Sequence, residues 1–106
     1  MATYQDFLKL ELRIGKIVEI NPHPNADKLY LLKVDIGNKI IQLVAGIRPY
    51  YNEDELKDKL IVVVTNLEPK EIRGYISEGM LLAASSAEDV SIISPDKTIE
   101  VGSKVK

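Results

Sequence analysis

The residues best suited to binding chemistry gather in one segment, residues 66–80, between two apolar runs. This segment places two cations, Lys70 and Arg73, three residues apart and follows them with Gly74 and the polar turn Ser77-Glu78-Gly79. Cations beside backbone N–H groups in a glycine-containing loop suit an anion such as phosphate. Because small domains rarely keep so long a loop without a use for it, the segment predicts a ligand-binding site.

Each of these residues also has a purely structural explanation. Exposed loop cations such as Lys70 are often ordinary solvated charges. The Ser77-Glu78-Gly79 turn can exist for its backbone alone, with Gly79 present for a positive φ. Met80 opens an apolar run and suits a core position. Residue types alone therefore leave the binding and structural interpretations open.

A second polar loop, residues 21–28, holds the only histidine, His23, between two prolines. One histidine and no cysteine make a metal site or a histidine-based catalytic triad improbable. The chain also lacks GxxxxGK[ST] and GxGxxG, the glycine-rich phosphate-binding motifs. We therefore expect a non-catalytic binding module that uses neither metal nor cofactor.

The elements that position these loops follow from hydrophobic periodicity. Leu12 and Ile14 alternate with charged residues, and Gly15 predicts a bulge in a strand that continues to Ile20. The other predicted elements are a strand with Tyr30, Leu32, Val34 and Ile36 on one face, a return strand over 39–45 after a Gly37-Asn38 turn, a helix over 52–57, strands over 60–65 and 80–85, and a late strand over 90–93.

This order predicts an all-β fold, a five-stranded OB-fold barrel with a short helix between strands 3 and 4 and a C-terminal extension. We expect one domain over residues 1–106, with the barrel over about 8–86 and the extension over about 87–106. An SH3-like barrel or another small β-sandwich has a similar strand count, but the helix position favours the OB-fold. OB-folds bind ligands across strands 2 and 3 and beneath the loops joining strands 1–2 and 4–5, which here are the two polar loops.

The overall composition limits the classes of ligand that this chain is expected to bind. With 14 Lys and Arg against 16 Asp and Glu, the net charge of −2 does not indicate a strong nucleic-acid binder, so folding must assemble any basic face. One Phe and no Trp offer few rings for stacking single-stranded bases, which favours recognition of a folded RNA. The lack of cysteine, signal-peptide pattern and membrane-length apolar run predicts a cytoplasmic protein without a membrane role.

Five ordered segments resemble the tRNA-binding domain family, and together they cover roughly residues 7–105. They are Arg13–Val18, His23–Gly37, Gln42–Ile47, Val62–Leu67 and Ser77–Ala84. Members of that family include a domain of methionyl-tRNA synthetases, free-standing tRNA-binding proteins and the export chaperone CsaA. The resemblance implies an OB-fold, a homodimer and recognition of the shape of tRNA.

The resemblance also implies a set of tRNA-binding residues. By position these are Lys33, Asn66, Arg73, Ser77 and Met80, with Lys28 and Lys70 in addition. The cations would contact phosphates, the side chains of Asn66 and Ser77 would donate or accept hydrogen bonds, and Met80 would pack on sugar or base. The implied role is an accessory β subunit that supplies tRNA to a separate catalytic chain of methionyl-tRNA synthetase. The alternatives are a CsaA-like chaperone for unfolded polypeptide and an assembly module that barely contacts RNA.

Overall fold

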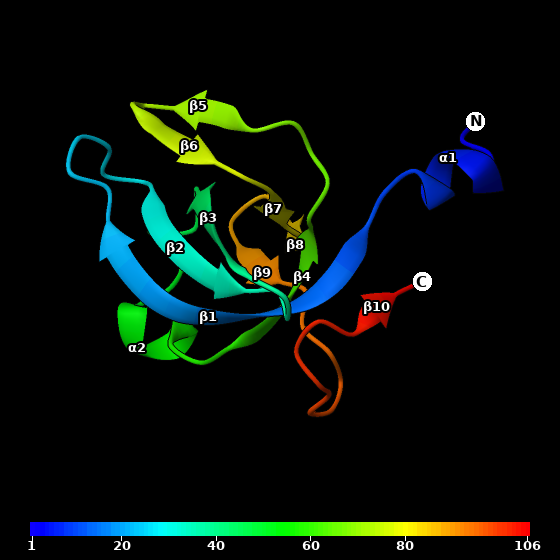
Figure 1. Ribbon diagram of the computed structural model, residues 1–106. Helices are drawn as coiled ribbons and strands as arrows, with labels where there is room; N and C mark the ends of the chain where they lie inside the picture. Colours follow the sequence, from blue (N-terminus) through cyan, green and yellow to red (C-terminus); the bar gives the residue numbers. More distant parts are fainter.

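The computed structural model describes residues 1–106 as a small β-barrel with two attached hairpins (Figure 1). The barrel strands are β1 (Leu12–Pro22), β2 (Tyr30–Asp35), β3 (Ile40–Ala45), β4 (Leu60–Val64) and β7 (Met80–Leu81). The other elements are the helices α1 (Tyr4–Leu8) and α2 (Glu53–Leu56), the hairpins β5 (Lys70–Ile72) with β6 (Tyr75–Ser77) and β8 (Ala83–Ser85) with β9 (Val90–Ile92), and the C-terminal strand β10 (Lys104–Val105).

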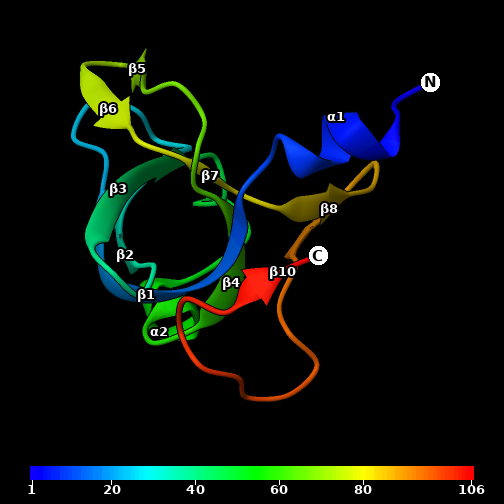
Figure 2. The same ribbon diagram turned by 45° about the vertical axis from the view of Figure 1, so that its right-hand side comes forward.

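The barrel strands pair antiparallel in the order β3-β2-β1-β4-β7 and curve round into a ring (Figure 2). The ring closes between β7 and β3 through polar contacts at the end of β6. Val44 N–H donates to the Ser77 hydroxyl at 3.0 Å, and Glu78 N–H donates to the Gln42 carbonyl at 2.7 Å. This nearly closed five-stranded antiparallel barrel confirms the predicted OB-fold.

Apolar side chains pack on both sides of the barrel wall. The inner core includes the four residues predicted to share one strand face, namely Tyr30, Leu32 and Val34 of β2 and Ile36 just after it. A smaller outer cluster joins Leu12 and Ile14 of β1 to Val62 and Val64 of β4. Strand β4 is therefore apolar on both faces, which explains its uninterrupted run of Leu, Ile and Val.

The C-terminal segment covers this outer cluster. Strand β10 pairs with the start of β1, and Val105 packs against the cluster. Upstream, Ile14 N–H donates to the Ser103 carbonyl at 2.9 Å. This C-terminal segment thus shields the outer face of β1 and β4, which would otherwise be exposed to water.

The predicted short helix is present as α2, where the Glu55 carboxylate accepts a hydrogen bond from Asn52 N–H at 2.8 Å. It buries Leu56 completely. Helix α1 was not predicted. Its capping box uses Thr3 and Asp6 in place of the commoner Ser/Thr and Glu pair, and it buries none of its side chains.

Three sequence-based expectations about the strands were wrong. Gly15 pairs regularly with Ile61, and the irregularity in β1 lies between Ile17 and Glu19. Gly15 is instead needed for a close approach, since a Cβ there would lie 2.7 Å from a Val34 methyl. The predicted strand over 80–85 breaks after Leu81, and its second half pairs with β9 outside the barrel. The long loop over 66–79, expected to be irregular, contains the β5–β6 hairpin.

Candidate nucleic-acid interface

The loop between β1 and β2 and the β5–β6 hairpin lie next to one another at one end of the barrel (Figure 1). We call residues 21–29 together with residues 70–77 the loop pair. Within the hairpin, directly opposed residues share a face, so Tyr75 and Ser77 turn toward the barrel while Glu71 and Ile76 turn outward. The loop pair thus forms one continuous surface from two segments nearly fifty residues apart.

Arg73 lies at the tip of the hairpin in an unusual backbone conformation. Its φ is +52° and that of Gly74 is +90°, which together make a two-residue turn between the paired residues Ile72 and Tyr75. Gly, Asn and Asp are the usual residues at such positions, because other side chains are strained there. Arg73 is held by its own contacts: its guanidinium donates to the Asn25 carbonyl at 2.8 Å.

His23 connects the two segments from inside. Its side chain is only 2% exposed. Nδ1 accepts a hydrogen bond from Asn25 N–H at 2.9 Å, and Nε2 lies 3.0 Å from the Arg73 carbonyl, to which it donates. The ring also packs edge to face on the Tyr75 ring, with the two ring centroids 4.9 Å apart. The sequence identified His23 only as a poor metal or triad candidate, and nothing local signals its partner fifty residues away.

Cations surround this surface. Lys28 and Lys70 are exposed, and Lys28 and Arg73 line a shallow hollow of about 450 Å³ with residues 25–27 and Leu29. No acidic side chain forms an ion pair with Lys28, Lys70 or Arg73. Their charges are therefore free to meet an anionic ligand, although Asp27 also lies at the hollow.

Lys33 is half-buried on the barrel face beside the hairpin. Its ammonium donates to Gln42 Oε1 at 3.0 Å, and Gln42 Nε2 donates to the Ile76 carbonyl at 2.9 Å. Gln42 therefore orients Lys33 and ties the barrel to the hairpin at once. No motif in the sequence marks Gln42; the available signal was its position opposite Lys33 in the β2–β3 register.

The hydroxyl of Ser77 is engaged within the protein. Ser77 is 4% exposed; its Oγ accepts from Val44 N–H and donates to the Gly79 carbonyl at 2.9 Å. Gly79 does not have the positive φ expected from the sequence. It is buried, and a Cβ there would lie 2.6 Å from the Val64 carbonyl. Ser77 and Gly79 thus bring β7 against the barrel wall.

Asn66 and Met80 lie outside the loop pair. Asn66 Oδ1 accepts from Glu11 N–H at 2.8 Å and its Nδ2 donates to the Lys9 carbonyl at 2.7 Å, so its amide anchors the N-terminal segment. Met80 is half-buried in β7 opposite Val64. The structure therefore brings Lys28, Lys70 and Arg73 to the loop pair, with Lys33 beside them, and leaves these two residues apart.

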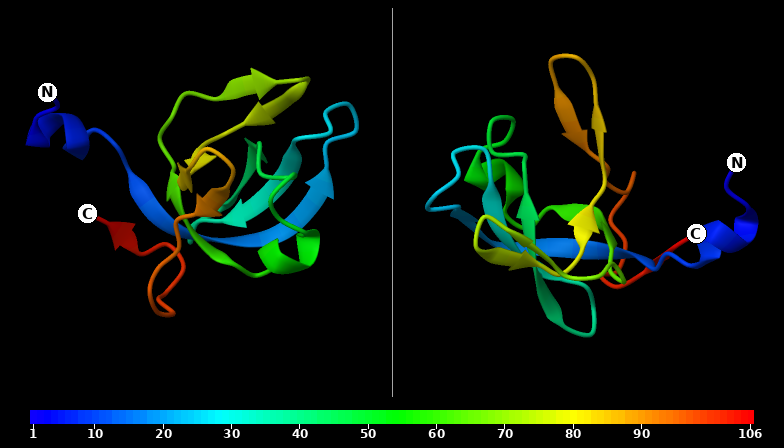
Figure 3. Two further views of the ribbon diagram at one scale, coloured as in Figure 1. Left: turned by 180° about the vertical axis from the view of Figure 1, so that it is seen from behind. Right: turned by 90° about the horizontal axis from the view of Figure 1, so that it is seen from above.

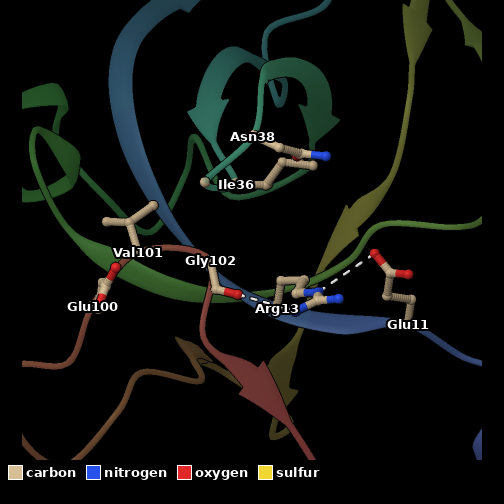
Figure 4. A pocket seen from close by; sticks show the side chains of 8 residues that line it. Glu11, Arg13, Ile36, Asn38, Glu100, Val101 and Gly102 are labelled. Atoms are coloured by element: carbon tan, nitrogen blue, oxygen red, sulfur yellow. Dashed lines mark hydrogen bonds and ion pairs between the residues drawn. The ribbon is translucent and has the colours of Figure 1, made fainter.

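A separate pocket of about 350 Å³ lies near the C-terminal segment (Figure 4). Arg13 donates there to Glu11 at 3.4 Å and to the Gly102 carbonyl at 3.2 Å, and Glu100 lines the same pocket. The Thr65 hydroxyl, which donates to Glu11, lowers the pKa of that carboxyl. The guanidinium is already paired and two acids are nearby, so this pocket is poorly suited to phosphate.

The fold and the loop pair define a small OB-fold binding domain that carries Lys28, Lys70 and Arg73 at one end. The family described as "Putative tRNA binding domain" matches residues 12–104. The chain belongs to this tRNA-binding domain family.

The relatives of this chain include methionine–tRNA ligases. That of Thermococcus onnurineus is 52% identical over 103 residues, which are 97% of this chain and 14% of the ligase. That of Thermotoga maritima is 46% identical over 97% of this chain and 16% of the ligase. The chain thus spans only a small part of these relatives.

Several solved structures match the whole chain, and two of them have the following similarity. A MetRS-related protein from Pyrococcus horikoshii has a TM-score of 0.93 and 30% identity, covering 100% of this chain and 98% of that one. The CsaA chaperone protein from Picrophilus torridus has a TM-score of 0.92 and 37% identity, covering 100% of both chains.

Neither of the two short helices has the length and apolar character that a membrane-spanning helix needs.

Proposed function

We propose that this chain binds folded tRNA, without catalytic activity of its own, and that the loop pair is its RNA-binding surface. The observation that carries the proposal is the cluster of Lys28, Lys70 and Arg73, free of acidic partners, beside Lys33 on the ligand-binding face of an OB-fold. Membership of the tRNA-binding domain family supports the same ligand. Cations placed on two protruding loops can contact phosphates of a folded RNA without reading its bases.

The residues predicted from the family pattern divide into two groups in this proposal. Lys28, Lys33, Lys70 and Arg73 contact phosphates. Ser77 and Asn66 act indirectly, because their polar atoms are already bonded within the chain. Met80, half-buried in β7, keeps its proposed contact with a sugar or base.

Few phosphate contacts imply a modest affinity. Each neutralised phosphate contributes about −0.7 to −0.9 to the slope of the logarithm of the binding constant against the logarithm of the salt concentration. Four contacting cations therefore predict a slope of roughly −3. This is consistent with a net charge of −2, which provides no general attraction for RNA.

The partner in this proposal is methionyl-tRNA synthetase, to which the chain serves as an accessory β subunit in the cytoplasm. The methionine–tRNA ligase relatives support this choice. Holding tRNA beside a catalytic chain raises its effective concentration there. In this role the chain delivers tRNA but forms no bond itself.

We propose further that the chain forms a homodimer through the side that carries both termini, opposite the loop pair (Figure 3). Tyr4, Phe7 and Leu8 of α1 and Leu10 after it expose large apolar surface there. Every residue of β8 is exposed, and its hairpin projects from the barrel. Surfaces of this kind favour burial against a second copy.

The test is a filter-binding titration of the chain with folded tRNA, heat-unfolded tRNA and a single-stranded oligonucleotide at two salt concentrations. We expect salt-weakened binding that prefers folded tRNA. Arg73→Glu and Lys70→Glu should weaken it at least tenfold, and Lys97→Glu, the same charge change at an exposed residue outside the loop pair, should weaken it much less. Equal binding to all three nucleic acids would reject the proposal.

The second candidate function is that of a chaperone for unfolded polypeptide. It is favoured by the match to the Picrophilus torridus CsaA chaperone over the full length of both chains. Its test is suppression of aggregation of a denatured client protein. Absence of any effect at excess dimer would remove this candidate. If neither activity is found but the chain captures a synthetase catalytic chain, it is an assembly module.

A further inference from the structure

We propose that His23 is a positioning residue for RNA binding, fixing the strained Arg73 turn so that the guanidinium is aimed before RNA arrives. This inference rests on the proposed function of the loop pair and names the residue that organises it. His23 itself is buried and does not reach the surface. Its effect must therefore pass through the residues it contacts.

The hydrogen-bond partners of the ring determine which nitrogen carries the proton. Nδ1 faces the N–H of Asn25, so it must be an acceptor, and Nε2 faces the carbonyl of Arg73, so it must carry the proton. The ring is therefore the neutral Nε2–H tautomer. The two nitrogens have different roles, because Nδ1 shapes its own loop and Nε2 joins that loop to the hairpin.

The hydrogen bond from Nε2 maintains a strained backbone geometry at Arg73. Arg73 has a φ of +52°, which arginine adopts rarely and at a cost. Its carbonyl is bonded to His23, and its guanidinium to the Asn25 carbonyl. Asn25 is in turn bonded to His23 Nδ1. His23, Asn25 and Arg73 thus form a closed ring of hydrogen bonds around the turn.

This arrangement leaves most of the Arg73 guanidinium free. A guanidinium has five N–H donors, and the bond to Asn25 uses one of them. The remaining donors are held on an exposed side chain at the hollow shared with Lys28. Asn or Gly would suit the turn better, and a strained residue held in place by its surroundings is typical of a functional position. Preorganising the charge lowers the entropy lost on binding.

The groups around the ring make substitution informative. An Asn side chain can replace the acceptor at Nδ1 but cannot reach Arg73, whereas a Gln side chain can replace the donor at Nε2. His23→Asn should therefore cut the bond between the loops and weaken binding of folded tRNA about tenfold. His23→Gln should retain that bond and stay within about threefold of the parent chain.

A double-mutant cycle separates positioning from general damage to the fold. If His23 acts through the Arg73 side chain, His23→Asn should weaken binding by at most about twofold when Arg73 is already alanine. In a Lys33→Ala background, the same substitution should retain its full tenfold effect. Thermal unfolding of every variant verifies that the compared proteins are folded.

The outcomes are distinct from those that test the proposed function. If the parent chain does not bind tRNA, the proposed function fails before His23 is tested. If it binds, and His23→Asn and His23→Gln weaken binding equally or independently of Arg73, the positioning role is wrong. Should either variant fail to fold, imidazole ¹⁵N shifts of the parent chain decide: an Nε2–H tautomer supports the inference, and an Nδ1–H tautomer overturns it.

Discussion

Replacing Ser77 by alanine tests whether this serine stabilises the barrel or contacts RNA. Its Oγ accepts from Val44 N–H at 3.0 Å and donates to the Gly79 carbonyl at 2.9 Å, and the side chain is 4% exposed. The substitution removes both bonds and leaves a buried N–H without a partner. An unpaired buried donor costs about 1–3 kcal/mol.

The expected change is large enough to measure directly. A loss of about 2 kcal/mol should lower the melting temperature of a domain of this size by roughly 10 °C. Calorimetry or circular dichroism on Ser77→Ala and on Ser94→Ala provides the comparison. Ser94 is exposed, and its side chain makes no hydrogen bond, so its substitution should leave the melting temperature within about 1 °C.

Binding to tRNA is measured on the same two variants at a temperature where both are folded. We expect Ser77→Ala to bind folded tRNA within about threefold of the parent chain, since its hydroxyl is not available at the surface. An unchanged melting temperature combined with a tenfold loss of binding would refute the reasoning. That result would mean that the hydroxyl contacts RNA and does not stabilise the closure of the barrel.

Contacts elsewhere in the chain give three further predictions. Gly79→Ala should lower the free energy of unfolding by about 1–3 kcal/mol, because the added Cβ would lie 2.6 Å from a carbonyl of β4. The control is Gly46→Ala, whose Cβ would meet no atom nearer than 3.8 Å. Equal denaturant midpoints for the two variants would contradict the prediction. Gln42→Leu releases Lys33 and should weaken tRNA binding several-fold in a titration; undiminished binding would show that Lys33 needs no orientation. Because the pKa of Glu11 is lowered in the folded chain, its ionised form contributes its full stability above about pH 4.5, and this stability is lost as the pH falls through the folded-state pKa. A midpoint at or above pH 4.5 in an NMR titration of Glu11 would contradict this prediction.

The barrel could be predicted from the sequence because its signals are local. Alternation in β2, the Gly37 turn and the Asn52 and Glu55 capping pair each act within a few residues. The β5–β6 hairpin escaped prediction because an arginine occupies its turn, where Asn, Asp or Gly is the usual sign. What stabilises that turn is the long-range contact with His23.

The candidate site could be predicted only in part, for the same reason. The positions of Lys70 and Arg73 in a long loop predicted a binding segment, and the structure places Arg73 in contact with the other polar loop. Whether a polar side chain is free depends on its three-dimensional partners, and no spacing rule places Ser77 beside Val44 or Asn66 beside Glu11. Sequence patterns thus predicted two candidate loops, while folding determined which of their side chains remain free of partners within the chain.

The most direct test of the proposed RNA-binding surface is an NMR titration of the ¹⁵N-labelled chain with folded tRNA. The loop pair should show the largest amide shifts or line broadening, above all residues 25–28 and 70–75, with Lys33 affected and α1 and β8–β9 little changed. Absence of perturbation, or perturbation confined to the side that carries the two termini, would contradict the assignment of the loop pair as the tRNA-binding surface.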